Sequence, residues 1–240
     1  MPCSIEKDNW LSSQIGKVSY KLFFKEPLIE RNKNEIKYWI IKNQNKEIFI
    51  YSKIPTKTVE ITALLETVGF KLIDTNVKFE LDKELITTKN SQRDIRICFA
   101  KKMHKKYAGN IAKNNFIYSR FHLDPLIDND IANRIKQSWV ENFFLGKRGD
   151  QMALALVNNE PIGFLQLIIK NKTLFIDLIG VDQKAQGKGV ASAMIQFVDQ
   201  NIKHTCIKVG TQIGNLPSIK LYQKLGFEFT GSDYVFHYHS

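Results

Sequence analysis

The sequence predicts an α/β protein with a mixed α+β sheet, and three observations carry that prediction. Short stretches rich in β-branched and aromatic residues alternate with stretches whose apolar residues recur every three or four positions. Three strand-like stretches in a row are followed by a glycine-rich turn and a helix-like stretch. A helix end, a Gly-Phe pair and a strand occur twice, at Gly69 and at Gly226. The repeat indicates that the N-terminal part is a truncated copy of the C-terminal part, unless it is only a common helix–glycine–strand junction.

We expect a small N-terminal α/β domain over residues 1–88 and a larger domain over residues 89–240. In the first domain, β-branched and aromatic residues predict strands at 18–24, 37–42 and 47–53. A helix is expected over 58–68, with Gly69 ending it. The stretch FKLIDTNVKFEL then forms a strand or a hairpin. The segment ITTKNSQRD has no apolar period and holds the domain boundary.

In the second domain, strand and helix patterns alternate along the chain. Helical spacing of Ile131, Ile135 and Trp139 supports one of the helices. Strands are expected at 94–101, 152–158, 161–170, 173–181 and 205–212, with a final strand pair at 227–231 and 233–238. Helices are expected at 102–115, 128–139, 189–201 and 216–225.

Composition narrows the class of protein. The chain of 240 residues carries a net charge of +11, which suits an acidic partner or reflects lysines scattered over solvated faces. Basic and aromatic residues do not combine in a nucleic-acid-binding motif, so we expect no nucleic-acid partner. Apolar runs are too short for a membrane span, and the first residues lack a signal-peptide core. The three cysteines are widely spaced, which predicts a reducing cytoplasm and no metal.

The segment DQKAQGKGVASAM, residues 182–194, lies between two apolar runs and has the form of a strand-to-helix turn. It lacks the spacing of a Walker loop and the third glycine of a dinucleotide fingerprint. Backbone N–H groups at the start of a helix attract an anion, and glycines let that anion approach closely. The turn therefore predicts an anion cradle. The alternative is an ordinary glycine loop that enters a helix.

The run QGKGVA within this turn fits the Q/R-x-x-G-x-G/A signature of the Gcn5-related N-acetyltransferases (GNAT), and the order of elements resembles that family as well. The resemblance implies acetyl-CoA as co-substrate, with its pyrophosphate on the turn and its pantetheine arm along the preceding strand. A backbone N–H of that strand would polarise the thioester carbonyl. The residues implied to bind acetyl-CoA are Leu178, Ile179, Val181, Gln186, Gly187, Lys188, Gly189, Val190, Ala191 and Asn215.

The segment VGTQIGNLPSIKLYQKLGF resembles the second coenzyme A motif of the family. Asn215 and Tyr222 are seven residues apart, so they share one helix face. The resemblance places Asn215 at the cofactor and Tyr222 near the thioester sulfur, where a phenol can protonate the leaving thiolate as general acid. The alternatives are that Asn215 caps the helix and that Tyr222 is a buried aromatic residue.

Nearly the whole chain resembles family members that acetylate the amine of dTDP-4-amino-4,6-dideoxygalactose. The features that carry this resemblance are the N-terminal domain, the stretches SRF and WVEN, and the run TQIGN. It implies Asp74 as proton acceptor or amine anchor, and Arg120, Trp139 and Asn142 as substrate-binding residues. Three of these residues have a structural alternative: Asp74 as a turn residue, Arg120 as a surface or structural arginine, and Trp139 as a core residue.

Two departures leave the sugar open. Leu221 replaces a basic residue of these relatives, and Asp74 replaces a glutamate. A gluco epimer or a UDP-linked sugar fits equally well. The other readings are an acetyltransferase of peptide N-termini or small amines, and a non-catalytic acyl-CoA-binding module. We expect no membrane partner, and a homodimer remains open.

Overall fold

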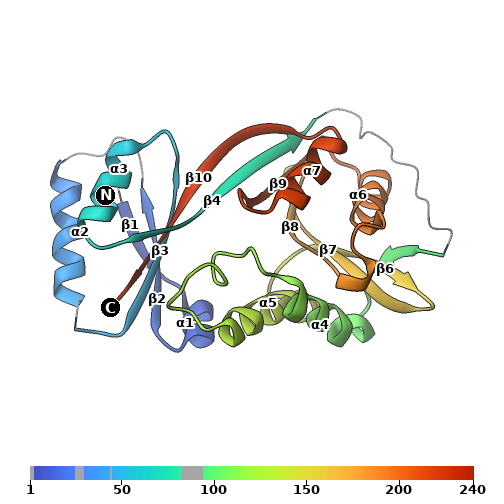
Figure 1. Ribbon diagram of the computed structural model, residues 1–240, viewed down its shortest axis with the longest axis horizontal. Helices are drawn as coiled ribbons and strands as arrows, with labels where there is room; N and C mark the ends of the chain where they lie inside the picture. The colour runs from blue at the N-terminus through green and yellow to red at the C-terminus, as the bar shows by residue number, and fades with distance from the viewer. Residues whose placement is uncertain (1–2, 25–29, 44, 83–93) are drawn as a thin grey trace. The chain divides into compact units, whose positions relative to one another are not determined.

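The computed structural model describes residues 3–24, 30–43, 45–82 and 94–240. Contacts between residues divide the chain into two compact units (Figure 1). Unit 1 comprises Met1–Asn76, Ser119–Ile131 and Gly231–Ser240, and unit 2 comprises Val77–Tyr118 and Ala132–Thr230. The expected boundary between residues 88 and 89 lies outside the described residues. The units are interleaved because two long strands, β4 and β10, each begin in one unit and end in the other.

Ten strands are described, and most of them match the expected positions. Their bounds are β1 Cys3–Lys7, β2 Val18–Phe24, β3 Ile48–Pro55, β4 Lys71–Leu81, β5 Arg96–Phe99, β6 Gln151–Val157, β7 Glu160–Lys170, β8 Thr173–Val181, β9 Cys206–Gln212 and β10 Glu228–His239.

The described helices comprise seven α-helices and two short 3₁₀ helices. Their bounds are α1 Asn9–Ile15, α2 Glu30–Asn43, α3 Val59–Thr67, η1 Lys102–His104, α4 Lys105–Asn115, α5 Asn129–Phe144, η2 Gln183–Ala185, α6 Val190–Asn201 and α7 Leu216–Lys224.

The described strands form one ten-stranded sheet, and its first five strands, in the order β1-β2-β3-β10-β4, lie wholly or partly in unit 1. The pair β2/β3 is parallel, whereas β1/β2 and β3/β10 are antiparallel. Helices α2 and α3 bury their apolar residues against one sheet face, where Ile40 and Leu65 meet Ile50 and Phe236. The other sheet face carries polar side chains, which include Tyr51 and His237 from paired positions of β3 and β10.

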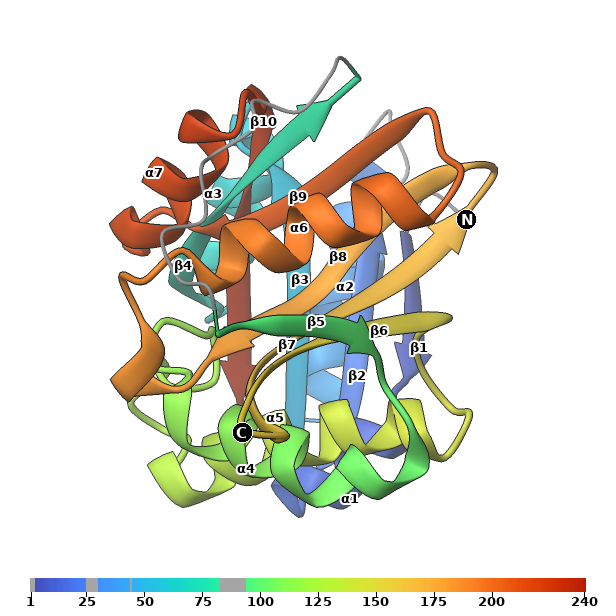
Figure 2. The ribbon, with the colours of Figure 1, turned by 90° about the vertical axis from the view of Figure 1, so that its right-hand side faces the viewer.

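The part of the sheet in unit 2 has the order β4-β9-β8-β7-β6-β5, in which β8/β9 is parallel. Figure 2 shows α6 lying across this sheet, with α4 and α5 on its other side. Met194 and Val198 of α6 pack with Leu165 of β7 in one apolar core, whereas Ile111 of α4 and Val140 of α5 belong to a second core. The mixed α/β class predicted from the sequence is confirmed.

One expected strand, 37–42, is wrong, because these residues lie in α2. Aromatic and β-branched residues suggested a strand, but the buried residues Ile36 and Ile40 are four positions apart, which is helical spacing. Tyr38 and Ile41 are exposed. The elements β1 and α1 were not expected at all.

The expected final strand pair is also wrong, because residues 228–239 form the single strand β10. The run Gly231–Asp233 resembles a turn in sequence, but Asp233 pairs with Pro55 of β3 and the strand continues from there. By contrast, the stretch from Lys71 to Leu81 is one strand, which is the first of the two forms expected for it.

The helix–Gly–Phe–strand repeat is present in the structure. Gly69 follows α3 with φ 94° and Gly226 follows α7 with φ 90°, and a long strand comes after each. Only glycine adopts this backbone conformation without strain, which explains its presence at both helix ends. The repeat therefore reflects equivalent junctions in the two halves of the chain.

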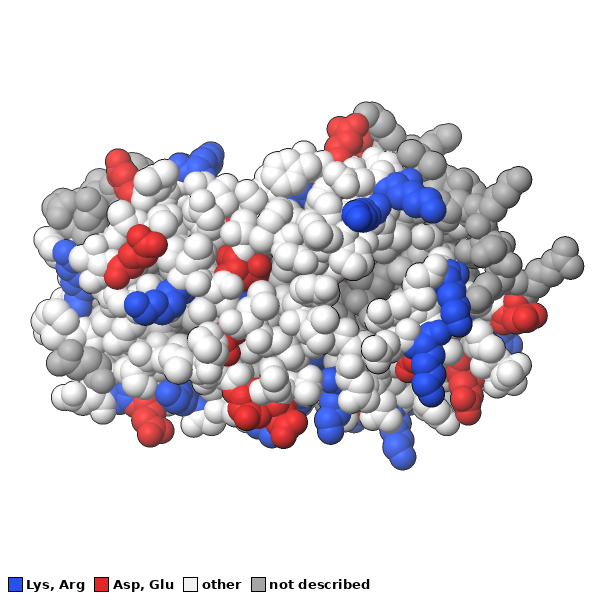
Figure 3. All heavy atoms as spheres, in the orientation of Figure 1, with Lys and Arg blue, Asp and Glu red and all other residues white. Residues whose placement is uncertain are grey.

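Charged side chains of both signs are interspersed on the face shown in Figure 3. The lysines and arginines visible there form no continuous basic surface, in line with the scattered distribution expected as one explanation of the net charge. Among the described helices, none is long and apolar enough to cross a membrane.

Candidate active site

Strands β8 and β9 separate part-way along their length. The parallel pairing joins Thr173–Ile176 to Cys206–Val209 and stops there, although β8 continues to Val181 and remains paired with β7. Within the described strands, residues 177–181 therefore have no ladder partner on the β9 side. Their free N–H and C=O groups form a short edge inside the sheet, where an extended ligand can pair as a strand would.

A bulge at Asp177 marks the point of separation. Leu167 pairs with Ile176 and Gln166 pairs with Leu178, so Asp177 is the inserted residue. The bulge resets the alternation of side chains between the two faces of the sheet, and Leu178 packs into the α4/α5 core. Ile179 lies against the α6/α7 core, as does Val181. The three residues predicted to line the pantetheine arm thus lie in the unpaired segment, and they differ in the side that their side chains face.

The glycine-rich turn connects the end of β8 to α6. Gly187 and Gly189 have φ values of 73° and 78°, a region that other residues enter at a cost. A Cβ at Gly187 would meet no atom within 4 Å, so this side of the turn is open. The side-chain amide of Gln186 donates to the carbonyl oxygen of Val181 at 3.1 Å and ties the turn to the strand end.

Helix α6 begins at Val190 with Gly189 as its N-cap, and no side chain caps it. The first N–H groups of the helix, which include those of Val190 and Ala191, have no partner within the helix. Together with the helix dipole they favour an anion at this point. Lys184 and Lys188 are exposed beside it. All six residues of the predicted signature therefore lie at one strand-to-helix junction.

Asn215 caps α7, as one of its two interpretations expected. Its Oδ1 accepts from the backbone N–H of Ser218 at 3.3 Å, and its Nδ2 donates to Thr211 Oγ1 at 3.2 Å. Both the oxygen and the nitrogen of the Asn215 side-chain amide therefore have hydrogen-bond partners within the protein. The contact of Asn215 with a cofactor stays a prediction.

Tyr222 is buried on the face of α7 that packs against the sheet. Its ring lies 5.5 Å from that of Phe227 and 6.0 Å from that of Phe79, centroid to centroid. Within the described part of the chain, its hydroxyl makes no hydrogen bond with a protein group. Burial raises the pKa of the phenol well above its usual value, so the group keeps its proton at neutral pH. Tyr222 can therefore donate a hydrogen bond but cannot serve as a base.

Asp177 is the centre of a polar cluster that sequence reasoning missed. Its carboxylate accepts from Arg148 Nε at 2.8 Å and Nη2 at 2.6 Å, from Trp139 Nε1 at 2.9 Å and from Gln166 Nε2 at 2.9 Å. The side chain is 8% exposed. A charged residue in the middle of the apolar run LFIDLIGV was the available signal. The cluster fixes the bulge from which the unpaired segment starts.

Trp139 and Asn142, two predicted substrate-binding residues, both have structural contacts in this cluster. The Trp139 indole donates to Asp177, and the Arg148 guanidinium lies 4.1 Å from its ring centroid. The backbone carbonyl of Asn142 accepts from the N–H groups of Lys147 and Arg148. These contacts favour the structural alternative for Trp139, and substrate contacts of either residue stay predictions.

Asp74 belongs to unit 1 and lies within β4, so its interpretation as a turn residue is wrong. Its Oδ2 is buried and makes no hydrogen bond within the described structure. Burial raises the pKa of this carboxyl group, while the backbone N–H of Thr75 and the charge of Lys53 lower it by less. A buried carboxylate with an unsatisfied oxygen is suited to accept a proton or to bind an amine.

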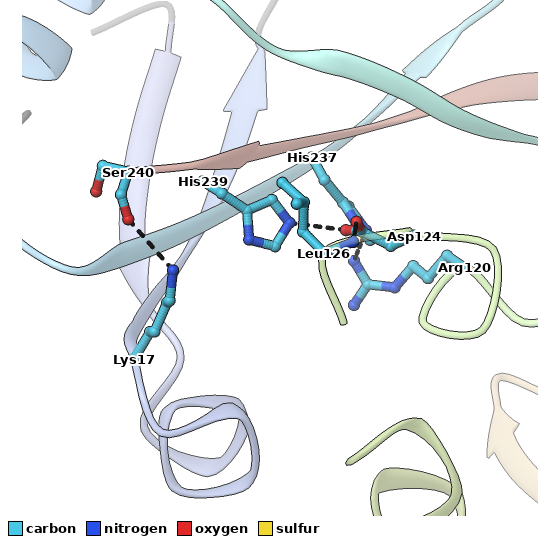
Figure 4. Close-up of polar contacts among 7 residues, drawn as sticks. All are labelled: Lys17, Arg120, Asp124, Leu126, His237, His239 and Ser240. Atoms are coloured by element: carbon cyan, nitrogen blue, oxygen red, sulfur yellow. Dashed lines mark hydrogen bonds and ion pairs between the residues drawn. The ribbon is translucent and has the colours of Figure 1, made fainter. Parts of the chain in front are cut away.

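Arg120, also in unit 1, has protein partners on several sides. Its guanidinium lies 3.9 Å from the ring centroid of Tyr51 and 4.4 Å from that of Phe121. Its Nη1 lies 3.3 Å from His237 Nε2 (Figure 4). These contacts give Arg120 a structural role, and a contact with a diphosphate stays a prediction.

His237 and His239 share one acceptor in the same cluster, and sequence reasoning missed both. Asp124 Oδ2 lies 2.6 Å from His237 Nδ1 and 2.7 Å from His239 Nε2 (Figure 4). Burial lowers the pKa of His237 to about 4, although Asp124 opposes this, so His237 is neutral at pH 7. The three side chains are close enough to hold a metal ion, since their ligand atoms lie within 4.8 Å of one another. In the structure both imidazoles are hydrogen-bonded to the Asp124 carboxylate.

Residues 117–227 match the family model described as "Acetyltransferase (GNAT) family". This segment, called the GNAT segment below, is similar to that family. The GNAT segment contains β8, the glycine-rich turn, α6 and α7, and therefore every residue predicted to bind acetyl-CoA.

Relatives and solved structures extend the comparison. The "Spore coat polysaccharide biosynthesis protein SpsD" of Bacillus subtilis is 32% identical over 130 residues, which are 53% of this chain and 45% of that protein. A "Spermine/spermidine N(1)-acetyltransferase" of the same organism is 32% identical over 66 residues, 26% of this chain and 43% of that protein. The chain spans about half the length of these relatives.

A GCN5-related N-acetyltransferase from Sphaerobacter thermophilus has a similar fold, with a TM-score of 0.66, 12% identity and coverage of 99% of this chain and 76% of that one. A tandem GNAT protein from the clavulanic acid biosynthesis pathway gives a TM-score of 0.61, 11% identity and coverage of 92% and 75%. These likenesses establish the fold.

Proposed function

We propose that the chain transfers the acetyl group of acetyl-CoA to the amine of a nucleotide-linked amino-deoxysugar, a dTDP-4-amino-4,6-dideoxyhexose. The observation that carries acetyl transfer is the unpaired segment of β8, which leads directly into a turn with two left-handed glycines and an uncapped helix. A pantetheine arm has amides that can pair with the strand, and the pyrophosphate is an anion suited to the helix end.

The reaction proceeds by direct attack in a ternary complex. The amine lone pair attacks the thioester carbon, and a backbone N–H of the unpaired segment donates to the developing oxyanion. Collapse of the intermediate breaks the C–S bond and releases the thiolate of coenzyme A. Tyr222 donates a hydrogen bond to that sulfur. Because burial holds the phenol pKa above that of a thiol, this hydrogen bond stabilises the thiolate more than complete proton transfer would.

The proton lost by the amine goes to a base, and we assign Asp74 to this role. Its raised pKa and its unsatisfied buried oxygen suit a group that must take up a proton near neutral pH. Arg120, Trp139 and Asn142 are the proposed contacts to the sugar nucleotide.

The nucleotide sugar is supported by the resemblance of nearly the whole chain and by the name of SpsD, a spore coat polysaccharide biosynthesis protein. The net charge of +11 also fits a substrate with a diphosphate. A polyamine, the substrate class in the name of the second relative, is itself a polycation and would be repelled by that charge. A cytoplasmic location is part of the proposal, since acetyl-CoA is a cytoplasmic metabolite.

The test is thiol release from acetyl-CoA with dTDP-4-amino-4,6-dideoxygalactose, its gluco epimer, the UDP-linked sugar, spermidine and a short peptide in parallel. We expect turnover of one nucleotide sugar that exceeds turnover of spermidine and peptide by about 10⁴-fold, the margin by which a site that hydrogen-bonds polar substrate groups rejects compounds that lack them. Equal or higher turnover of spermidine or peptide would overturn the proposed acceptor but leave acetyl transfer in place. Tight acetyl-CoA binding without turnover of any acceptor would favour a non-catalytic module.

A further inference from the structure

A cavity of about 450 Å³ lies beside strand β5 in unit 2. In the strand order, β5 is the terminal strand and is separated from β8 by β6 and β7. The cavity is thus distinct from the proposed acetyl-CoA site. Its volume falls within the range of about 300–1,000 Å³ that is typical of small-molecule sites.

The floor of the cavity is apolar. Cys98 of β5 and Leu156 of β6 both belong to the α4/α5 side of the sheet, where they pack against the second apolar core. Met103, which precedes α4, also lines the cavity and is 76% exposed. A ligand would therefore meet an apolar surface on this side of the cavity.

His104 supplies a directed hydrogen-bond donor. Its Nδ1 accepts the backbone N–H of Lys101 at 3.0 Å, so the proton of the neutral imidazole resides on Nε2. The residue is 8% exposed, and within the described chain Nε2 makes no hydrogen bond. Burial lowers the pKa of His104, and the charges of Lys101 and Arg96 lower it further. The imidazole is therefore a neutral donor that lines the cavity with its Nε2–H unused.

Arg96 and Lys101 add two positive charges to the same cavity. The guanidinium Nη2 of Arg96 donates to Asn159 Oδ1 at 3.0 Å, which holds the group at the turn between β6 and β7. Among the described residues that line the cavity, none is acidic. A site with two cations, one buried donor and no carboxylate favours an anion.

We propose that this cavity binds a small organic anion, with a carboxylate or phosphate group on Arg96, Lys101 and His104 and an apolar body on Cys98 and Leu156. The site is independent of acetyl transfer. Because Cys98 lies within it, the thiol reports both the local potential and the occupancy of the cavity.

The test compares alkylation of Cys98 by iodoacetate, an anion, and by iodoacetamide, which is neutral. Both reagents attack the thiolate, so the effects of the thiol pKa and of access to the site are the same for both and divide out in the ratio of the two rates. Cys206 is the reference in the same molecule, because its charged neighbours Lys208, Glu80 and Asp82 include two carboxylates and one ammonium group, in contrast to the cationic cavity. At low salt we expect the ratio at Cys98 to exceed that at Cys206 about fivefold, and the excess to fade at ~0.5 M salt.

The variants Arg96→Gln and Lys101→Gln each remove one charge from the cavity. Lys224→Gln is the matched control, because it removes an exposed charge from α7 on the opposite side of the sheet. Each cavity variant is expected to lower the ratio at Cys98 about twofold, whereas the control leaves it unchanged. Both side chains are exposed, so the melting temperature should stay constant.

Occupancy is tested with phenyl phosphate, benzoate, inorganic phosphate and benzyl alcohol. Phenyl phosphate or benzoate at ~10 mM should slow iodoacetamide at Cys98 at least threefold and leave Cys206 unaffected. Inorganic phosphate should protect less, because it has the anionic group but no apolar body. Benzyl alcohol should not protect at all, because it has the apolar body but no charge. Equal rate ratios at the two cysteines, an unreactive Cys98, or protection by benzyl alcohol alone would each overturn the proposal.

Discussion

The role assigned to Tyr222 depends on one hydroxyl group. The ring is buried and packed, but within the described residues the hydroxyl has no hydrogen-bond partner, so Tyr222→Phe preserves the packing. We expect kcat to fall about 100-fold, as for loss of a group that acts on a leaving atom, while acetyl-CoA affinity stays within about twofold. Steady-state kinetics and calorimetric titration of acetyl-CoA measure the two quantities. An unchanged kcat would show that Tyr222 is only a core residue.

Ionisation of Asp74 should determine how the rate depends on pH on the acidic side. The base must be ionised, so activity should fall as the pH decreases through the raised pKa of this carboxyl group. Asp74→Asn should abolish most activity and the acidic limb of the profile. Asp94→Asn, at an exposed position, should change neither.

The same substitution also tests the burial of Asp74 through stability. A carboxyl group whose pKa is raised on folding gives a stabilisation that is present below the unfolded pKa of about 3.9 and is lost as the pH rises through the folded pKa. Asp74→Asn should therefore raise the free energy of unfolding at pH 7 relative to the native chain, and the gain should vanish near pH 3. Urea unfolding at both pH values measures it, and a loss at pH 7 would contradict the assignment.

Asp177 is expected to matter mainly for stability. The variant Asp177→Asn removes the charge that Arg148, Trp139 and Gln166 share, and hydrogen bonds to charged groups contribute about 1.5–3 kcal/mol. We expect the free energy of unfolding, measured by urea denaturation, to fall by at least about 2 kcal/mol. Arg148→Lys keeps the charge but not the two-nitrogen contact, so it should lose less. A variant as stable as the native chain would mean that the cluster does not hold the bulge.

At the scale of elements, two glycines provide a matched comparison. Gly187 and Gly146 have φ values of 73° and 66°, and a Cβ at either would meet no atom within 4 Å. Substitution by alanine should therefore cost both variants about 1–2 kcal/mol of stability. Only Gly187→Ala lies in the turn proposed to hold the pyrophosphate, so only it should raise the Kd of acetyl-CoA, by about tenfold or more. Equal Kd values for the two variants would remove the turn from the site.

Sequence patterns located elements well where one local signal was strong. The turn at Asn158 and Asn159, with φ 51° and 66°, and the junction at Gly226 consist of residues that adopt a positive φ more easily than most others. Helix α1 was missed although Asp8 caps it and Gly16 ends it, because its single buried residue, Leu11, gives no apolar period. Helix α2 was mistaken for a strand because composition was weighed above the spacing of its buried residues.

Long-range contacts set the limit of prediction for the site. The glycine-rich turn is contiguous in sequence, so its residues were found together. The bulge cluster joins Trp139, Arg148, Gln166 and Asp177, which are far apart in the chain, and the histidine cluster joins Asp124 to β10. The interleaving of the two units was not predicted for the same reason, since it depends on a long-range pairing: β10 starts in unit 2 and pairs with β3 in unit 1. No local pattern reports which distant strand a segment will pair with.

For the molecule as a whole, the central claim is that acetyl-CoA binds along the unpaired segment of β8 and on the turn that follows. Hydrogen exchange across the entire chain, with and without acetyl-CoA, tests it most directly. We expect the ligand to slow exchange at residues 178–181 and 187–192 and to leave the strands β1, β2 and β5 unchanged. Binding that protects other segments and leaves these two at their free rates would contradict the account.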